Sequence, residues 1–129
     1  MKIETAALVA MSVLATDALA ESPAQPLRGL FCASEAHLDA ALIRYQAGEN
    51  MAVILAQLNE FEQVCTLADR ISYIVTAPIA LGRAGSSGPF KYRAILVAVQ
   101  VGANLRQIEP PVAVFFFREM PIENAAMET

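Results

Sequence analysis

The chain has 129 residues and a formal net charge of −4, and 56% of its residues are hydrophobic. This length is typical of one domain, and the apolar content is that of a folded globular chain, not of a disordered one. The composition has no basic stripe and no polybasic cluster, which excludes nucleic-acid binding through a basic surface and electrostatic attachment to an anionic membrane.

Residues 1–20 have the three-part layout of a secretory signal peptide. Lys2 supplies a positive charge, residues 6–15 are almost wholly apolar, and Ala18 and Ala20 are the small residues that precede a cleavage site. The apolar run covers about 10 residues, whereas a membrane-spanning helix needs about 20, so an uncleaved anchor is the weaker alternative. The sequence therefore predicts cleavage after Ala20 and export to the periplasm or the medium, with no stable membrane span afterwards.

Cys32 and Cys65 are the only two cysteines of the chain. In an oxidising compartment two cysteines most simply form one disulfide, and no Cys-x-x-Cys spacing indicates a redox-active pair. We expect a structural Cys32–Cys65 bridge that ties the start of a helical region to the start of a sheet.

Two helices are predicted in the first half of the mature chain. The first is expected over residues 35–47, because Ser34 is a favourable N-cap and apolar residues then recur at helical spacing. The second is expected to begin at Met51 and to end near Asn59, although its apolar stripe also continues beyond Glu62.

From Ile71 onward the apolar period changes to two, which predicts strands. The first strand covers residues 71–81 and contains Pro78, which cannot donate a ladder hydrogen bond, so we expect it at a sheet edge. A glycine-rich hairpin loop leads to a second strand over residues 90–101. Its inner half is apolar on both sides, which indicates a central strand. The third strand covers residues 111–117.

This segregated order of elements is typical of an α+β fold. We predict a single domain over residues 21–129, in which two short helices precede a three-stranded antiparallel β-meander and pack on one face of it, with one disulfide. Residues 21–28 are interpreted as an extended leader and residues 119–129 as a flexible tail. The layout resembles that of small exported bacterial proteins in size and order of elements, and the resemblance implies no activity.

Three consecutive phenylalanines, Phe115–Phe117, end the last predicted strand. Successive strand residues point to opposite faces, so both faces of this strand need a cover. The helices cover one face. Residues 21–33, residues 119–129 or a partner chain cover the other, and an uncovered apolar face of this kind is typical of an interface. The sequence therefore leaves open a protein partner or a homo-oligomer that docks on the apolar sheet face.

No arrangement of residues predicts a catalytic centre, a metal site or a cofactor. His37 is the only histidine, and helical spacing directs it away from Glu35 and Asp39, which share a face. Residues 85–88 have neither nucleophile-elbow nor P-loop spacing and are interpreted as a turn.

One group of side chains does suggest a binding surface. Arg83, Lys91 and Arg93 flank the predicted hairpin, and Tyr92 lies between the last two. A positive, aromatic hairpin tip can hold an anionic group or an acidic partner surface, whereas the alternative is an ordinary solvated strand end.

These observations predict a small exported, disulfide-bonded binding or interaction module, and the lack of a catalytic constellation favours a protein that is not an enzyme. One alternative is a small envelope hydrolase whose site is assembled from distant residues, with Glu35, Asp39 or Glu60 as acid or base. The other is an accessory subunit of an envelope complex.

Overall fold

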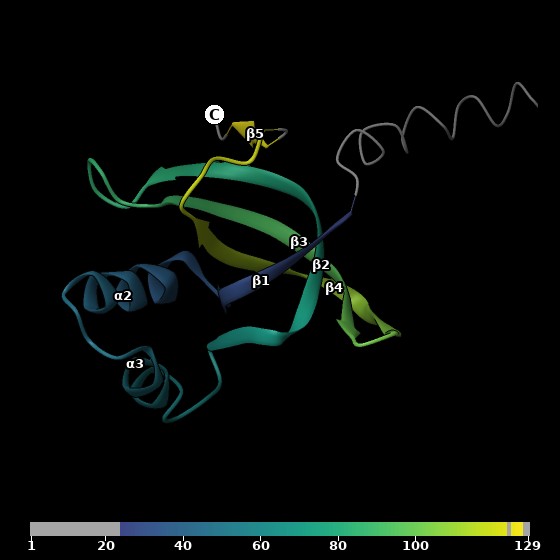
Figure 1. The fold of residues 1–129 in the computed structure, drawn as a ribbon, viewed down its shortest axis with the longest axis horizontal. Coiled ribbons are helices and arrows are strands. Elements are labelled where there is room, and N and C mark those ends of the chain that lie inside the picture. Colours follow the sequence, from purple (N-terminus) through teal and green to yellow (C-terminus); the bar gives the residue numbers. More distant parts are fainter. Residues whose placement is uncertain (1–23, 124, 128–129) are drawn as a thin grey trace, which may run out of the picture.

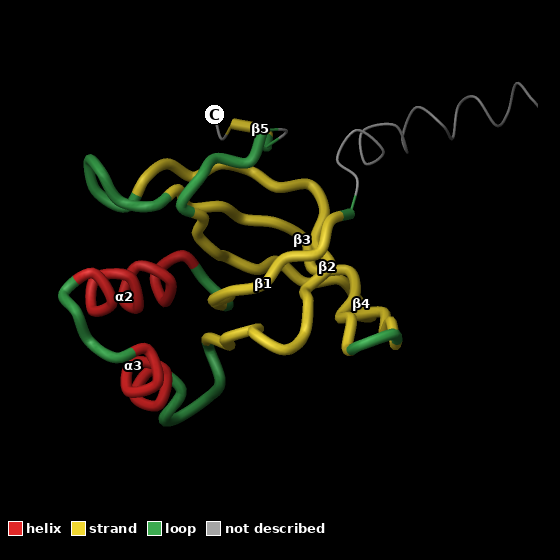
Figure 2. Tube along the Cα trace, in the orientation of Figure 1, coloured by secondary structure: helices red, strands yellow, loops and turns green. Residues whose placement is uncertain are grey.

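The computed structural model describes residues 24–123 and 125–127, and the predicted signal peptide lies outside them. The helices are α2 (Glu35–Gln46) and α3 (Met51–Leu58). The strands are β1 (Gln25–Cys32), β2 (Cys65–Arg83), β3 (Phe90–Val101), β4 (Asn104–Arg118) and β5 (Ala126–Met127), as Figures 1 and 2 show.

The strands form one sheet that closes on itself. β3 lies between β2 and β4, and β1 pairs with both of these outer strands, so four antiparallel pairings make a ring. The pairing of β1 with β4 is short, with Phe31 opposite Phe116 and Cys32 opposite Phe115. β5 adds to β2 in the parallel direction, which makes the sheet mixed. Both helices lie together on one side of this ring (Figure 1).

The predicted α+β fold with a three-stranded meander is wrong. Strands make up 54% and helices 19% of the described residues, so the protein is mostly β. The segment interpreted as a leader contributes residues 25–28 to β1, and the predicted tail contributes β5. β1 has no alternating pattern in its first half and becomes a strand because β2 pairs with it, a long-range contact that local sequence does not carry.

β2 is not the edge strand that Pro78 predicts. It pairs with β1 along its first half and with β3 along most of its length. The pairing is irregular between Thr76 and Ile79, where Ala77 has a φ of 55°. Pro78 lies inside this irregularity, where the ladder needs no donor, and a proline is therefore tolerated within a paired strand. The strand is strongly curved, which lets it border both β1 and β3 (Figure 1).

The sheet separates two apolar cores. The inner core lies within the closed sheet and consists of Leu27, Phe31, Ala68, Val75, Tyr92, Ala94, Leu96, Val114 and Phe116. The outer core joins the sheet to the helices and consists of Leu30, Cys32, Leu38, Ala41, Leu42, Ile54, Val64 and Cys65.

The three consecutive phenylalanines of β4 divide between these cores. Phe116 is buried in the inner core, with ring centroids 5.3 Å from Phe31 and 5.7 Å from Tyr92. Phe115 and Phe117 pack against the outer core. Residues of the same chain thus pack on both faces of the strand at these three phenylalanines.

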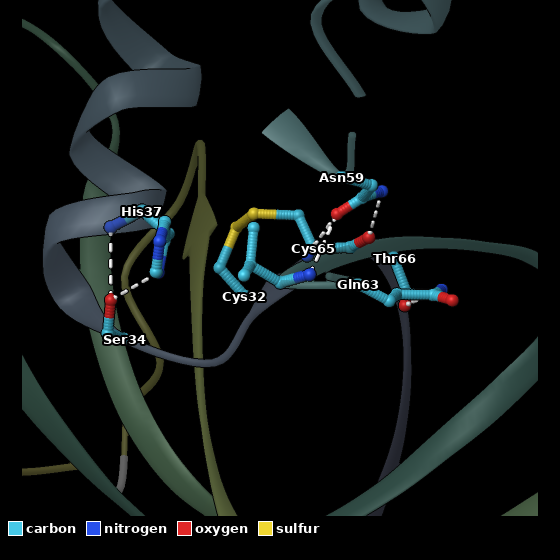
Figure 3. The surroundings of a disulfide bond; sticks show 8 residues. Cys32, Ser34, His37, Asn59, Gln63, Cys65 and Thr66 are labelled. Atoms are coloured by element: carbon cyan, nitrogen blue, oxygen red, sulfur yellow. Dashed lines mark hydrogen bonds between the residues drawn. A yellow bond between two sulfur atoms is a disulfide. The ribbon is translucent and has the colours of Figure 1, made fainter. Parts of the chain in front are cut away.

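The Cys32–Cys65 disulfide is confirmed. Cys32 ends β1 and lies opposite Cys65, the first residue of β2, with the Cα atoms 4.0 Å apart. Asn59, which follows α3, fixes the chain beside it (Figure 3). Its Oδ1 accepts hydrogen bonds from the backbone nitrogens of Val64 and Cys65 at 2.8 and 2.9 Å, and its Nδ2 donates to the Cys65 carbonyl at 2.8 Å. The bond therefore encloses both helices in one covalent loop.

Candidate functional site

Lys91 is a buried cation that joins β3 to α2. Its side chain is 11% exposed, and its ammonium donates to Glu35 Oε2 at 2.9 Å and to Asp39 Oδ1 at 2.8 Å. The two carboxylates lie one turn apart on α2, so the helix presents both to the same point. Burial acts to lower the pKa of Lys91, but the hydrogen bonds and charges of Asp39 and Glu35 outweigh burial and raise that pKa. The charge of Lys91 is thus matched within the chain.

Replacing Lys91 by methionine is expected to lower the free energy of unfolding by about 1–3 kcal/mol, because Glu35 and Asp39 then lack their cation. The value stays below that of a fully buried pair because the two carboxylates are 44% and 45% exposed and solvent screens them. Since folding raises the pKa of Lys91, the stabilisation is fully present below its unfolded pKa of 10.5 and is lost as the pH rises through the folded value.

Urea denaturation at several pH values checks this prediction. The stability difference between the native chain and Lys91→Met should be constant through neutral pH and should shrink above about pH 10.5. A difference that stays the same into the alkaline range, or no difference at neutral pH, would contradict the role of the ion pairs.

Arg83 lies at the exposed end of β2 and is directed toward its own hairpin. Its guanidinium carbon lies 4.6 Å from the centre of the Phe90 ring, and its Nε donates to the Gly88 carbonyl at 3.0 Å. Its partner across the hairpin is Phe90, not Lys91 or Arg93. Arg83 and Lys91 line a cavity of about 420 Å³ between α2 and the hairpin, together with Asp39.

The remaining two predicted site residues point to opposite faces of β3. Tyr92 belongs to the inner core and is 2% exposed. Arg93, the next residue, has the opposite orientation and lies across from Ile79 of β2 and Phe115 of β4. Arg83 and Lys91 therefore line one cavity, Tyr92 joins them in the lining of a second cavity described below, and Arg93 lines neither.

Ser34 and His37 form a contact that resembles a nucleophile and its base. Ser34 Oγ lies 2.7 Å from His37 Nδ1 and accepts the backbone N–H of His37 at 3.1 Å (Figure 3). The same hydroxyl caps the N-terminus of α2. Neither Ser34 nor His37 lines the cavity between α2 and the hairpin or either of the two cavities described below. Within the described part of the chain, no cluster of His, Cys, Asp and Glu side chains could hold a metal ion. The Ser34–His37 contact is therefore a helix cap.

A groove of about 650 Å³ opens beside β1, and we call it the edge groove. One wall is Gln25 with residues 27–30, and the other is residues 117–123. β1 pairs with β4 only at Phe31 and Cys32. The residues of β1 before Phe31 and those of β4 after Phe116 do not pair with each other, and the groove lies between them. Arg118 Nη1 donates to the Arg28 carbonyl across the gap at 3.3 Å.

The chain after β4 crosses back to β2, and we call residues 119–123 and 125–127 the C-terminal strap (Figure 1). Its β5 strand pairs with Ile79 and Ala80. Closer to β4, the backbone N–H of Ile122 donates to the Tyr92 hydroxyl at 2.7 Å, and Ile122 and Ala125 pack against the inner core. The segment expected to be a flexible tail is thus anchored at two points.

A further cavity of about 340 Å³ lies between the C-terminal strap and the β2–β3 hairpin, and we call it the strap pocket. Most of its lining is apolar, and the buried Tyr92 contributes to it. The lining residues are Ala80, Gly82, Arg83, Phe90, Lys91, Tyr92, Pro121, Ile122, Glu123, Ala125 and Met127.

Neither helix in the described part of the chain has the length and apolar character needed to cross a membrane. Comparison of the chain with protein-family models, with curated proteins and with solved structures finds no match.

Proposed function

We propose that this chain is an exported, disulfide-bonded binding module that holds an extended segment of a partner polypeptide in the edge groove. The observation that carries the proposal is the short pairing of β1 with β4, which is limited to Phe31 and Cys32. The disulfide supports export, because structural disulfides persist mainly in oxidising compartments.

Main-chain edges border the edge groove on both sides. β1 pairs with β2 on one side, and among the described residues it has no strand partner on the other side over Gln25–Leu30. Across the groove, Phe117 and Arg118 pair with β3 but not with β1. An extended peptide inserted between these edges can form main-chain hydrogen bonds to both, as in strand addition. Pro26 has no backbone N–H and so removes one hydrogen-bond donor from β1. The other residues of this edge keep their donors, so the edge is only partly protected against strand addition.

The charges that line the edge groove are balanced. Arg28 and Arg118 are cationic, and Glu119 and Glu123 are anionic. The guanidinium of Arg28 is already engaged with β2, since its Nε lies 3.3 Å from Ser72 Oγ and its Nη1 lies 3.4 Å from the Asp69 carbonyl. This balance favours a polypeptide of mixed charge over a polyanion.

A pair of variants at Arg28 separates main-chain pairing from side-chain contacts. The Arg28 carbonyl accepts from Arg118 across the groove, and Arg28 lies at an irregularity between Leu27 and Gly29, where β1 has no ladder partner in β2. Arg28→Pro therefore removes a main-chain donor beside the groove without removing a ladder pair to β2, whereas Arg28→Ala removes the same side chain and keeps the donor.

Random linear peptides displayed on phage, selected against oxidised residues 21–129, provide the ligand. We expect selected peptides to bind Arg28→Ala with nearly native affinity and Arg28→Pro at least about tenfold more weakly. Equal binding to both variants, selected peptides that map by NMR to the hairpin around Arg83, or no selectable peptide at all would overturn the proposal. Matching thermal unfolding of the two variants verifies that both are folded.

A further inference from the structure

We propose that the strap pocket is a second site, which binds a small apolar carboxylate of the size of a medium-chain fatty acid through the hydroxyl of Tyr92. This inference goes beyond the proposed function. The strap pocket and the edge groove share only Pro121, Ile122 and Glu123 among their lining residues.

The size and lining of the strap pocket fit a short apolar chain. Its volume of about 340 Å³ is at the lower end of the range for small-molecule sites, about 300–1,000 Å³. Phe90, Ile122 and Ala125 supply apolar surface. Met127 also lines the pocket and is 75% exposed, so a bound aliphatic chain would remove apolar surface from water.

The hydroxyl of Tyr92 gives the pocket a polar group with an unused proton. Tyr92 is 2% exposed, and its oxygen accepts the N–H of Ile122 at 2.7 Å. Among residues 24–123 and 125–127, no acceptor receives the hydroxyl proton. Buried donors are nearly always paired in native proteins, and a ligand oxygen in the strap pocket would supply the missing acceptor.

Arg83 gives the strap pocket a guanidinium that can pair with a carboxylate. Arg83 uses its Nε for the Gly88 carbonyl, and its two terminal nitrogens have no hydrogen-bond partner in the described part of the chain. Lys91 already donates to two carboxylates of α2, so we do not assign it to the ligand. Glu123 is the one anionic side chain in the lining, which makes a cationic ligand the natural competitor in a test.

Titration of oxidised residues 21–129 with decanoate, below its micelle-forming concentration, tests the proposal by calorimetry and NMR. We expect saturable binding that shifts the resonances of Tyr92, Ala125 and Met127, and no binding of decyltrimethylammonium. Ala125→Trp, which fills the pocket, should abolish binding. Equal binding of the cationic probe, or shifts confined to the edge groove, would overturn the proposal.

Tyrosine variants identify the group that holds the carboxylate. Tyr92→Phe should weaken decanoate binding about tenfold or more, whereas Tyr45→Phe on α2 should leave it unchanged. Because Tyr92→Phe also releases the strap, Ile122→Pro serves as a second variant that removes the same hydrogen bond but keeps the hydroxyl. Retained binding in Ile122→Pro supports the proposal, and equal loss in Tyr92→Phe and Ile122→Pro overturns it.

These experiments distinguish a failure of the strap-pocket proposal from a failure of the edge-groove proposal. Peptide binding at the edge groove is measured on Ala125→Trp and should be retained, because Ala125 lines the strap pocket and not the edge groove. Loss of peptide binding in Arg28→Pro, with decanoate binding retained, supports two distinct sites.

Discussion

Truncation of Phe116 to alanine is expected to lower the free energy of unfolding by about 3–5 kcal/mol. The side chain is 2% exposed and packs between Phe31 of β1 and Tyr92 of β3, so its removal leaves a cavity in the inner core. It also lies directly opposite Phe31, at the short pairing that closes the sheet. Urea denaturation followed by circular dichroism measures the change.

Two other phenylalanines provide matched controls for this prediction. Phe61→Ala should change the free energy of unfolding by less than about 0.5 kcal/mol, because Phe61 is 93% exposed. Phe117→Ala should have an intermediate effect, since Phe117 is only partly buried against the outer core. A Phe116→Ala change as small as that of Phe61→Ala would contradict the closed sheet.

Removal of the disulfide in the double variant Cys32→Ala/Cys65→Ala is expected to lower the free energy of unfolding by about 3–4 kcal/mol. The two cysteines are 33 positions apart, and their bond restricts the unfolded chain over this whole loop. A loss of this size is a large share of the roughly 5–15 kcal/mol by which domains are stable. Thermal and denaturant unfolding of both proteins measure it.

Reductant provides the control for the disulfide prediction. It should destabilise the native chain by a similar amount and should leave the double variant unchanged. An unfolding midpoint that does not move when the native disulfide is reduced would show that the bond does not stabilise the fold.

The local features of the fold could be predicted from the sequence. Ser34 and Asn50 cap the two helices, each accepting a backbone N–H with its side chain, and both helices form close to the predicted bounds. Glu35 and Asp39 do share a helix face, since both contact Lys91. Capping and helical spacing act over a few residues, which is why the sequence predicts them.

The closure of the sheet could not be predicted in the same way. β1 lacks alternation in its first half, and its pairing with β2 joins segments on the two sides of both helices. Pro78 would predict an edge strand if the ladder around it were regular. The pairing of β2 with β3 is irregular at this position, and this irregularity depends on contacts between distant segments. Long-range pairing decides these features, and a local pattern does not report it.

The candidate sites show the same limit. The sequence singles out Tyr92, but as part of a basic hairpin tip, whereas strand alternation directs it into the inner core and Lys91 toward α2. Two carboxylates one helical turn apart were the available signal for a buried lysine partner. The edge groove had no such signal, because it forms where two distant segments diverge.

Pairing of an extended peptide with the edge of β1 is tested most directly by NMR of the oxidised protein bound to a selected peptide. We expect nuclear Overhauser contacts between backbone protons of the peptide and those of β1 at Arg28, together with slowed exchange of the Arg28 amide. Contacts confined to side chains of the hairpin or of the helices, with the Arg28 amide still exchanging freely, would contradict it.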